Sequence, residues 1–167
     1  MPIKLPILCS VIFFSIFGFG CEKKTRQVSD QVTPKTQYPA PEITESTPQR
    51  VRDLTAIIYA LEKYKLDNRK YPISSNGYDG LHTDYGRASE KWIEGLVPKY
   101  LDKLPSDPRK NESGNDQYIY RSNGANYKLI AHNPDDCEQV KKLFPNIVDP
   151  LRDCWAYGFW TKKAAYW

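Results

Sequence analysis

Thiol, imidazole and carboxylate groups lie close together in the C-terminal part of this 167-residue chain. His132 stands five residues before Cys137, with Asp135 and Asp136 between them. A thiol beside a base can act as a nucleophile, so this group could in principle perform covalent catalysis. The spacing does not fix the geometry that this chemistry needs, and a second cysteine, Cys154, follows in the same region. In an exported protein such a pair favours a disulfide.

The chain contains four cysteines, and their positions favour a structural pair over a reactive thiol. Cys9 lies in an apolar leader that export would remove, and Cys21 stands at the end of that leader. Cys137 and Cys154 are then the even pair left in the mature domain. A bridge between them would close a loop of about 18 residues and stabilise the fold by on the order of 3 kcal/mol.

Residues 1–20 have the features of an export signal. Lys4 supplies a positive charge, and the apolar run that follows is shorter than the roughly 20 residues of a membrane span. The run ends in Gly18-Phe19-Gly20-Cys21, which resembles the lipobox of bacterial lipoproteins, although leucine is usual where Gly18 stands. In lipoproteins this cysteine receives a diacylglyceryl group and becomes the mature N-terminus. We predict a lipoprotein-type signal peptide with a membrane lipid on Cys21; an uncleaved anchor or an ordinary secretory signal is the alternative.

Residues 21–47 are polar, contain several prolines, threonines and glutamines, and have almost no large aliphatic side chains. A segment of this composition cannot bury enough apolar surface to fold alone, so it predicts a flexible tether. Its ends would lie roughly 25–30 Å apart on average. The remaining residues, 48–167, are long enough to form one globular domain with its own core.

Charge and ligand chemistry argue against several classes of function. The net charge is +4, but basic and acidic residues are interspersed, which argues against nucleic-acid binding. The two histidines, His82 and His132, lie far apart in the sequence and give little support for zinc. Paired carboxylates such as Asp135 and Asp136 do not define the separation that a glycosidase needs. We expect neither an enzyme nor a cofactor.

The domain is predicted to begin with an amphipathic helix. Thr47 is a suitable N-cap, and Pro48 fits the first helical position, where its missing N–H is not needed. Apolar side chains then recur at helical spacing and form one stripe, consisting of Val51, Leu54, Ile57, Ile58, Leu61 and Tyr64. The helix should end near Asp67-Asn68, because Pro72 disfavours helical angles before it and asparagine tolerates the left-handed turn.

Later segments have the pattern of strands. Residues 118–121 and 127–132 flank an Asn-Gly pair that favours a hairpin turn, and a last strand is predicted over 155–161. Alternation in the second strand should place Tyr127, Leu129 and Ala131 on one face. Residues 92–100 predict a short helix or turn over the sheet, and residues 137–144 a short helix that Asp135 or Asp136 would cap. The fold class is therefore α+β, one helix against a small antiparallel sheet.

Three segments resemble a known family, the major pseudopilins, or G subunits, of type II secretion systems. LEKYKLDNRKYP (61–72) is similar to the family's Tyr-x-x-Asp-Asn-x-x-Tyr-Pro junction, and YLDKLPSDPR (100–109) to its Leu-Pro-x-Asp-Pro loop. Residues 117–132 are similar to its strand pair. The resemblance implies a head like those of pseudopilins and type IV pilins. The motif positions are Tyr64, Asp67, Asn68, Tyr71, Pro72, Leu104, Pro105, Asp107 and Pro108.

The chain also departs from this family. A pilin or pseudopilin begins its mature chain with a long hydrophobic assembly helix, cut after a glycine, with a glutamate at its fifth position. A cut after Gly18 would leave the apolar run on the wrong side. We therefore expect a lipid and a tether in place of the assembly helix.

The resemblance further implies a calcium-binding loop, which is acidic and glycine-rich in the G subunit. This chain has His132-Asn133-Pro134-Asp135-Asp136-Cys137 instead. Oxygen ligands could come from Asp135, Asp136, Asp149 and Asp153, but these residues suit solvated loops or helix caps better, so we predict no metal site. A bridge from Cys137 to Cys154 could brace this region, as a C-terminal disulfide does in many type IV pilins.

Together these features predict a non-enzymatic, lipid-anchored protein of the cell envelope. It would act through contacts with envelope or secretion-system proteins. The alternative is a module that binds a glycan or peptide through an exposed aromatic face. Aromatic candidates for that face are Trp92, Trp155, Trp160 and Trp167.

Overall fold

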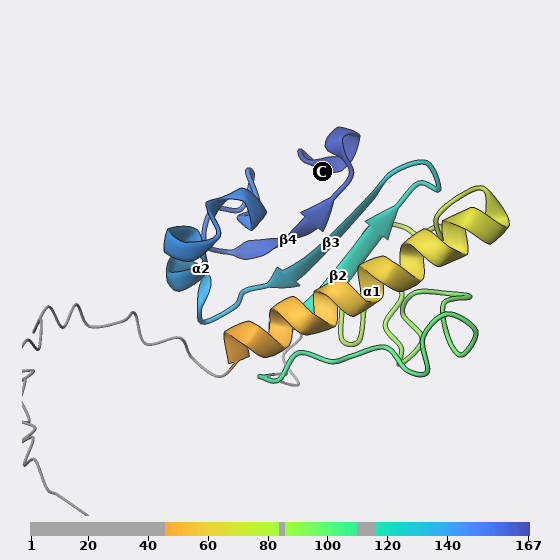
Figure 1. Cartoon of the computed structure of the whole chain (residues 1–167), viewed down its shortest axis with the longest axis horizontal. Helices are drawn as coiled ribbons and strands as arrows, with labels where there is room; N and C mark the ends of the chain where they lie inside the picture. The colour runs from red at the N-terminus through yellow and green to blue at the C-terminus, as the bar shows by residue number, and fades with distance from the viewer. Residues whose placement is uncertain (1–45, 84–85, 110–115) are drawn as a thin grey trace, which may run out of the picture. The chain divides into compact units, whose positions relative to one another are not determined.

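The structure is a computed structural model that describes residues 46–83, 86–109 and 116–167. The predicted signal peptide, Cys21 and nearly all of the tether lie outside these residues. Figure 1 shows the long helix α1 lying across one face of the sheet, as the α+β prediction requires. The helices and strands are α1 (Ser46–Asn68), β1 (Asp79–Gly80), β2 (Gln117–Ser122), β3 (Tyr127–His132), α2 (Cys137–Leu143) and β4 (Ala156–Trp160), with 3-10 turns at Pro145–Ile147 and Lys162–Ala164.

The sheet is antiparallel, and its strands are ordered β1-β2-β3-β4. β2 and β3 pair along their whole length, with Tyr118 opposite Ala131. The predicted hairpin is confirmed: Gly124 has φ +87°, and the side-chain oxygen of Asn123 accepts two N–H bonds from the turn. β1 was not predicted, because two residues are too few to show a period.

The two faces of the sheet bury different side chains, as the alternation along β3 predicts. Tyr127, Leu129 and Ala131 belong to the main core under α1. Ile130 lies in a smaller cluster on the opposite face, whose other members are Tyr78, Ile119, Ala156 and the half-buried Trp160. β4 begins one residue later than predicted, which leaves Trp155 in the preceding turn with 65% of its surface exposed.

α1 ends where the sequence predicts, but both of its predicted terminal details are wrong. Thr47 lies inside the helix rather than capping it, and its hydroxyl donates to Asp136. Arg69, not Asn68, takes the left-handed conformation, with φ +62°. The Asn68 amide instead donates to the Tyr64 carbonyl oxygen at 2.8 Å. No helix in the described part of the chain combines the length and hydropathy needed to cross a bilayer.

Residues 91–100 form a series of turns that cover part of the core. Trp92, Ile93 and Leu96 are buried there and pack with α1 and the sheet, so the predicted covering role is confirmed. Pro98 follows a cis peptide bond and keeps this segment from continuing as a helix.

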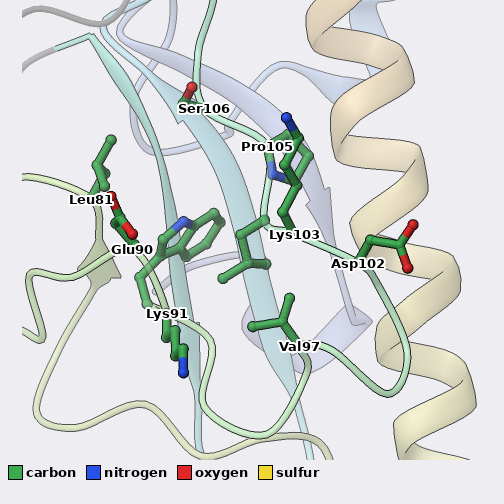
Figure 2. Close-up of a pocket in the computed structure, with 10 residues that line it drawn as sticks. Leu81, Glu90, Lys91, Val97, Asp102, Lys103, Pro105 and Ser106 are labelled. Atoms are coloured by element: carbon green, nitrogen blue, oxygen red, sulfur yellow. The ribbon is translucent and has the colours of Figure 1, made fainter.

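A cleft of about 350 Å³ opens beside these turns. Figure 2 shows Glu90 and Lys91 on one side of it and Val97 and Pro105 on the other. The lining mixes apolar side chains with charges of both signs. Its described lining includes no histidine or cysteine; the groups there that can act as base or nucleophile in other proteins are the carboxylates of Glu90 and Asp102 and the hydroxyl of Ser106.

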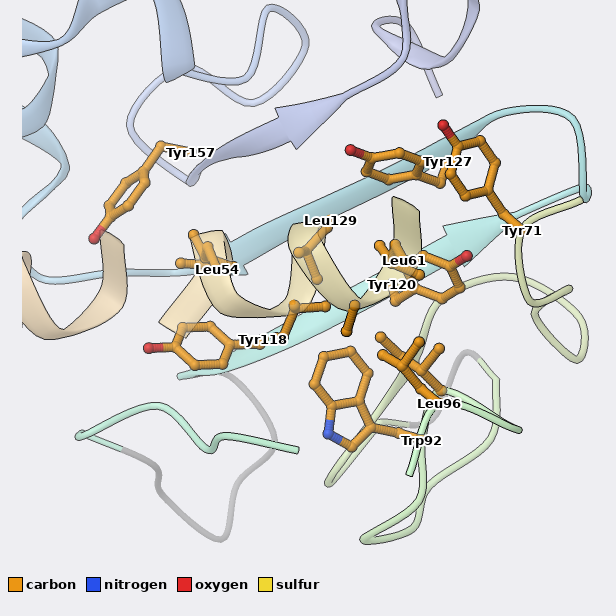
Figure 3. Close-up of a cluster of buried hydrophobic side chains, with 14 of the residues drawn as sticks. Leu54, Leu61, Tyr71, Trp92, Leu96, Tyr118, Tyr120, Tyr127, Leu129 and Tyr157 are labelled. Atoms are coloured by element: carbon orange, nitrogen blue, oxygen red, sulfur yellow. The ribbon is translucent and has the colours of Figure 1, made fainter. Parts of the chain in front are cut away.

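The main core lies between α1 and the sheet (Figure 3). Leu54, Ile57 and Leu61 of α1 are fully buried. Much of the remaining space is filled by Tyr71, Tyr118, Tyr120, Tyr127 and Tyr157. Every buried side-chain nitrogen and oxygen in the described residues has a hydrogen-bond partner, so this tyrosine-rich core leaves no polar atom unsatisfied.

Replacing Leu61 with alanine tests the core. Leu61→Ala should lower the free energy of unfolding by about 2–5 kcal/mol, because it leaves a cavity beneath α1. The matched control on the same helix is Leu66→Ala, whose side chain is 73% exposed and should cost less than about 0.5 kcal/mol. Urea unfolding followed by tryptophan fluorescence measures both; equal losses would contradict the packing of α1.

Candidate functional site

A group of buried charges lies at the start of α1. Arg50 stands one turn before Leu54 on the buried face of the helix, and its side chain is fully buried. The loop after the 91–100 turns brings Asp107 to it, and the loop between β3 and α2 brings Asp135 and Asp136. We call Arg50 and these three aspartates the ion cluster. A fully buried arginine requires such partners, because an unpaired buried charge is very costly.

Arg50 uses each edge of its guanidinium group. Nε and Nη2 donate to the two oxygens of Asp107, each at 2.9 Å, in the bidentate geometry that suits a planar fork. Nη1 donates to Asp135 Oδ1 at 2.6 Å and to Asp136 Oδ1 at 2.9 Å. One side chain therefore joins α1 to two loops that lie 57 and 85 residues away in the sequence.

The remaining oxygens of the ion cluster are also bonded. Asp136 Oδ2 accepts bonds from the hydroxyl groups of Thr47 and Tyr157. Arg109 pairs with Asp135 Oδ2 at the edge of the cluster. Asp136 occupies the N-cap position of α2, one of the two positions predicted, but its side chain makes no cap bond to the helix.

The electrostatics of the ion cluster keep its members charged. Burial alone would lower the pKa of Arg50, but hydrogen bonds to Asp107 and Asp135 outweigh it and raise this pKa above its ordinary value. Burial would likewise raise the pKa of Asp135, but its bonds to Arg50 and Arg109 bring that pKa below the usual range. Neither group is poised to exchange a proton near neutral pH, as a general acid or base must be.

A second buried ion pair lies on the opposite face of the sheet. Lys128 of β3 donates to Asp149 at 2.9 Å, and both side chains are fully buried. Arg152 binds the other Asp149 oxygen at 2.9 Å and donates to the carbonyl oxygen of Trp167. Lys128 also donates to the carbonyl oxygen of Ala165, so this pair fixes the last residues of the chain against the sheet.

The candidate aspartates do not fit a calcium site. Calcium takes six to eight oxygen ligands around one point. In the described residues, no group of three or more His, Cys, Asp or Glu side chains is arranged so that it could hold a metal ion, and the three aspartates around Arg50 are no exception. Each candidate pairs with a cation of the chain: Asp135 and Asp136 with Arg50, Asp149 with Lys128, and Asp153 with Lys141.

The first family-like segment connects the end of α1 to the 91–100 turns. Asp67 accepts bonds from the Tyr100 hydroxyl at 2.9 Å and from the Lys99 ammonium at 2.8 Å. The Asn68 amide donates to the same hydroxyl at 3.1 Å, and the Tyr64 ring packs edge-on against Tyr100. Asp67 and Lys99 are exposed, so these contacts position a segment rather than build a reactive centre.

The Tyr71-Pro72 pair docks on the β2–β3 hairpin. The Tyr71 N–H donates to the Gly124 carbonyl oxygen, and the Tyr120 hydroxyl donates to the Pro72 carbonyl oxygen, both at 2.8 Å. The Tyr71 hydroxyl donates to Glu62 at 2.9 Å. Burial, together with Glu62, raises the pKa of Tyr71 to about 12, so this hydroxyl stays protonated at neutral pH.

The second family-like segment ends at the ion cluster. Leu104 packs against the main core, and Pro105 lines the cleft beside it. Asp107 then enters the cluster, and its Oδ1 also accepts the N–H of Arg109 at 2.9 Å. Pro108, which cannot donate a backbone bond, stands between them. The role of this segment is therefore to deliver one buried carboxylate to α1.

Cys137 and Cys154 are free thiols in this structure, but their side chains are in contact. Cys137 is buried at the start of α2, and Cys154 lies in the turn before β4. Burial raises the pKa of both thiols, and contact with Cys154 raises that of Cys137 further. A raised pKa leaves little thiolate at neutral pH and argues against a nucleophile. The disulfide stays a prediction, which this contact supports.

The aromatic candidates do not gather on one surface. Trp92 is only 2% exposed within the main core, whereas Trp160 packs on the opposite face of the sheet. Trp155 is exposed in the turn before β4. The four tryptophans therefore do not form the single binding platform that the sequence allowed.

His82 and His132 belong to no metal-binding group of the described residues.

Residues 42–144 match the family described as Type II secretion system (T2SS), protein G, and the match covers more than half of the chain. The chain belongs to this family. The type II secretion system core protein G of Aeromonas hydrophila is 38% identical over 63 residues, which are 36% of this chain and 42% of that relative. The chain thus spans less than half the length of this protein G relative. No solved structure matches significantly.

The protein G match contains all of the ion cluster, yet sequence reasoning missed Arg50. A signal was present, because Arg50 precedes Leu54 by four residues and Ile57 by seven, the spacing of one helix face. A charged residue in line with a buried apolar stripe is unusual and predicts a buried ion pair. Its partners could not be found in the same way, since they lie in loops without a period.

The cysteine pair gives a prediction on stability. In protein purified under oxidising conditions, the mass should fall by that of two hydrogens, and the free energy of unfolding should exceed that of the reduced protein by on the order of 3 kcal/mol. Cys137→Ser and Cys154→Ser should each abolish the difference between oxidised and reduced samples. An oxidised wild type whose two thiols still react with maleimide would contradict the bridge.

Asp135 gives a prediction on acid stability. Its pKa is lower in the folded head than the value of about 3.9 in unfolded chains. Its contribution is therefore fully present above about pH 5 and is lost as pH falls through the lower folded pKa. Asp135→Asn should flatten the fall in stability below about pH 4, measured by urea midpoints from pH 7 to pH 2.5. The control is Asp102→Asn on an exposed turn; an unchanged acid slope in the Asp135 variant would contradict the pairing.

Proposed function

We propose that this protein is a lipoprotein, anchored through Cys21, whose pseudopilin-like head acts by contacting other proteins of the cell envelope. Components of a type II secretion system are the proposed partners, and no enzymatic activity is proposed. One observation carries this proposal: a protein G family head over residues 42–144 follows a short apolar leader that ends in a cysteine. Residues 21–47 are the proposed tether between the two.

The sequence before the head supports a lipid in place of an assembly helix. The segment between Cys21 and α1 is polar and rich in proline, so it lacks the side chains that pack an apolar fibre core. α1 itself carries Arg50, Arg52 and Asp53 in its second turn. A diacylglyceryl group would supply two acyl chains, and two chains are what stable membrane anchoring needs.

Several features of the head support a role through contacts. Its buried charges are paired and stay ionised, its two thiols have raised pKa values, and its cleft contains no histidine or cysteine among the described residues. These properties suit a structural head better than a catalytic one. The alternative, a module that binds glycan or peptide through an aromatic face, has less support because Trp92 and Trp160 lie on different faces of the sheet.

The anchor is tested by mass spectrometry of the mature N-terminus in protein extracted from membranes. The expected N-terminal residue is Cys21 with a diacylglyceryl group, and the Cys21→Ser control should lack this mass and leave the membrane fraction. An unmodified N-terminus, or cleavage at another residue, would overturn the proposed anchor. It would leave membership of the protein G family unaffected.

The partners are tested by cross-linking intact cells and purifying the full chain. Type II secretion proteins should be enriched with the wild type, and deletion of the gene should reduce the amount of a secreted substrate in the medium. The Cys21→Ser variant keeps the head but loses its proposed location, so it should recover fewer partners. Normal secretion after deletion, with no secretion protein cross-linked, would contradict the proposed role. Glycan fragments should leave tryptophan fluorescence unchanged; a saturable shift would favour the ligand-binding alternative.

A further inference from the structure

Three carboxylates converge at the start of α1 from different parts of the chain. Asp107 comes from the loop before β2, while Asp135 and Asp136 come from the loop after β3. Carboxylates that meet in this way repel one another and need a cation at their centre. A protein can supply that charge as a bound metal ion or as one of its own side chains.

In this chain the charge comes from Arg50. Its guanidinium bonds four carboxylate oxygens at 2.6–2.9 Å. A calcium ion shared by these carboxylates would have to lie between them, in the space that the guanidinium group already occupies. Arginine cannot release its proton to make room, because its pKa is far above neutral. The aspartates and a divalent cation are therefore incompatible while Arg50 is present.

We propose that Arg50 is a built-in substitute for a structural metal ion, so that the two loops stay fixed to α1 at any calcium concentration. The three aspartates then do not fit a calcium ion because Arg50 occupies the space between them. It makes the stability of the head independent of divalent cations. This inference rests neither on the lipid anchor nor on a role in secretion.

The charge balance of the site supports this substitution. Three carboxylates face the guanidinium groups of Arg50 and Arg109, which leaves one net negative charge. Without Arg50 the excess would be two negative charges, the charge that a calcium ion neutralises. The hydroxyl groups of Thr47 and Tyr157 already lie against Asp136 and would add neutral oxygens to the space left behind. Removing Arg50 should therefore create a site for a hard cation.

The first experiment measures thermal unfolding of the full chain in mild detergent, in EDTA and in 5 mM calcium chloride, with ionic strength matched by sodium chloride. The wild-type Tm should be the same in EDTA and in calcium chloride. Arg50→Met keeps much of the side-chain volume but removes the charge, and its Tm in EDTA should fall by on the order of 10 °C. Calcium should recover part of that loss. Arg52→Met, at an exposed position of the same helix, is the matched control and should show neither effect.

Terbium luminescence gives a second reading of the same site. Terbium is a hard, calcium-like cation that tyrosine can sensitise, and Tyr157 is bonded to Asp136 at 3.0 Å. Arg50→Met should show a saturable signal that calcium displaces, whereas the wild type and Arg52→Met should show none. If Arg50→Met does not fold, Arg50→Lys keeps the charge without the planar fork. It should unfold at a lower Tm than the wild type and remain insensitive to calcium.

Three outcomes would overturn the proposal. A wild-type Tm that rises with calcium and falls with EDTA would mean that a metal already supports the fold. An Arg50→Met variant as stable as Arg52→Met would mean that Arg50 does not hold the loops. A destabilised Arg50→Met variant that neither calcium nor terbium affects would mean that the carboxylates do not form a cation site without Arg50.

Discussion

The buried guanidinium group of Arg50 is the constraint on which the head most depends. It connects α1 to two segments far away in the sequence, one that precedes β2 and one that precedes α2. Buried ion pairs are often no more stabilising than apolar packing, because removing charges from water is costly. Once the carboxylates are buried, however, a cation must match them, and the observed arrangement of the loops satisfies every bond of the cluster. The cluster thereby fixes where the loops lie.

The three family-like segments, which are far apart in the sequence, contact one another in the fold. Asp67 and Asn68, at the end of α1, bind Tyr100 at the start of the second segment. Pro72 accepts a bond from Tyr120 in the third. The abrupt end of α1 before Tyr71-Pro72 is therefore required by the fold: the chain must leave the helix at once to reach the hairpin.

Periodicity explains what could be predicted from the sequence. The body of α1, the β2–β3 hairpin, α2 and β4 each repeat apolar side chains at a regular spacing, so their positions were foreseen within one or two residues. The ion cluster was not foreseen, because Asp107 and Asp136 meet Arg50 only through the tertiary fold, 57 and 86 residues away. The buried pairing of Lys128 could not be predicted either, for the same reason. The alternation that places Leu129 on one face of β3 puts Lys128 on the other, but the burial of Lys128 against Asp149 depends on a later loop.

The ion cluster lies at the N-terminal end of α1. α1 begins at Ser46, and Thr47 and Arg50 make their long-range bonds within its first two turns. At this end of α1, three parts of the chain are therefore joined by charged hydrogen bonds. Such bonds are short, directional and stronger than neutral ones, so this end resists fraying more than an ordinary helix start would. This resistance suits the tether proposed for residues 21–47, because the start of α1 is then fixed by bonds within the described head.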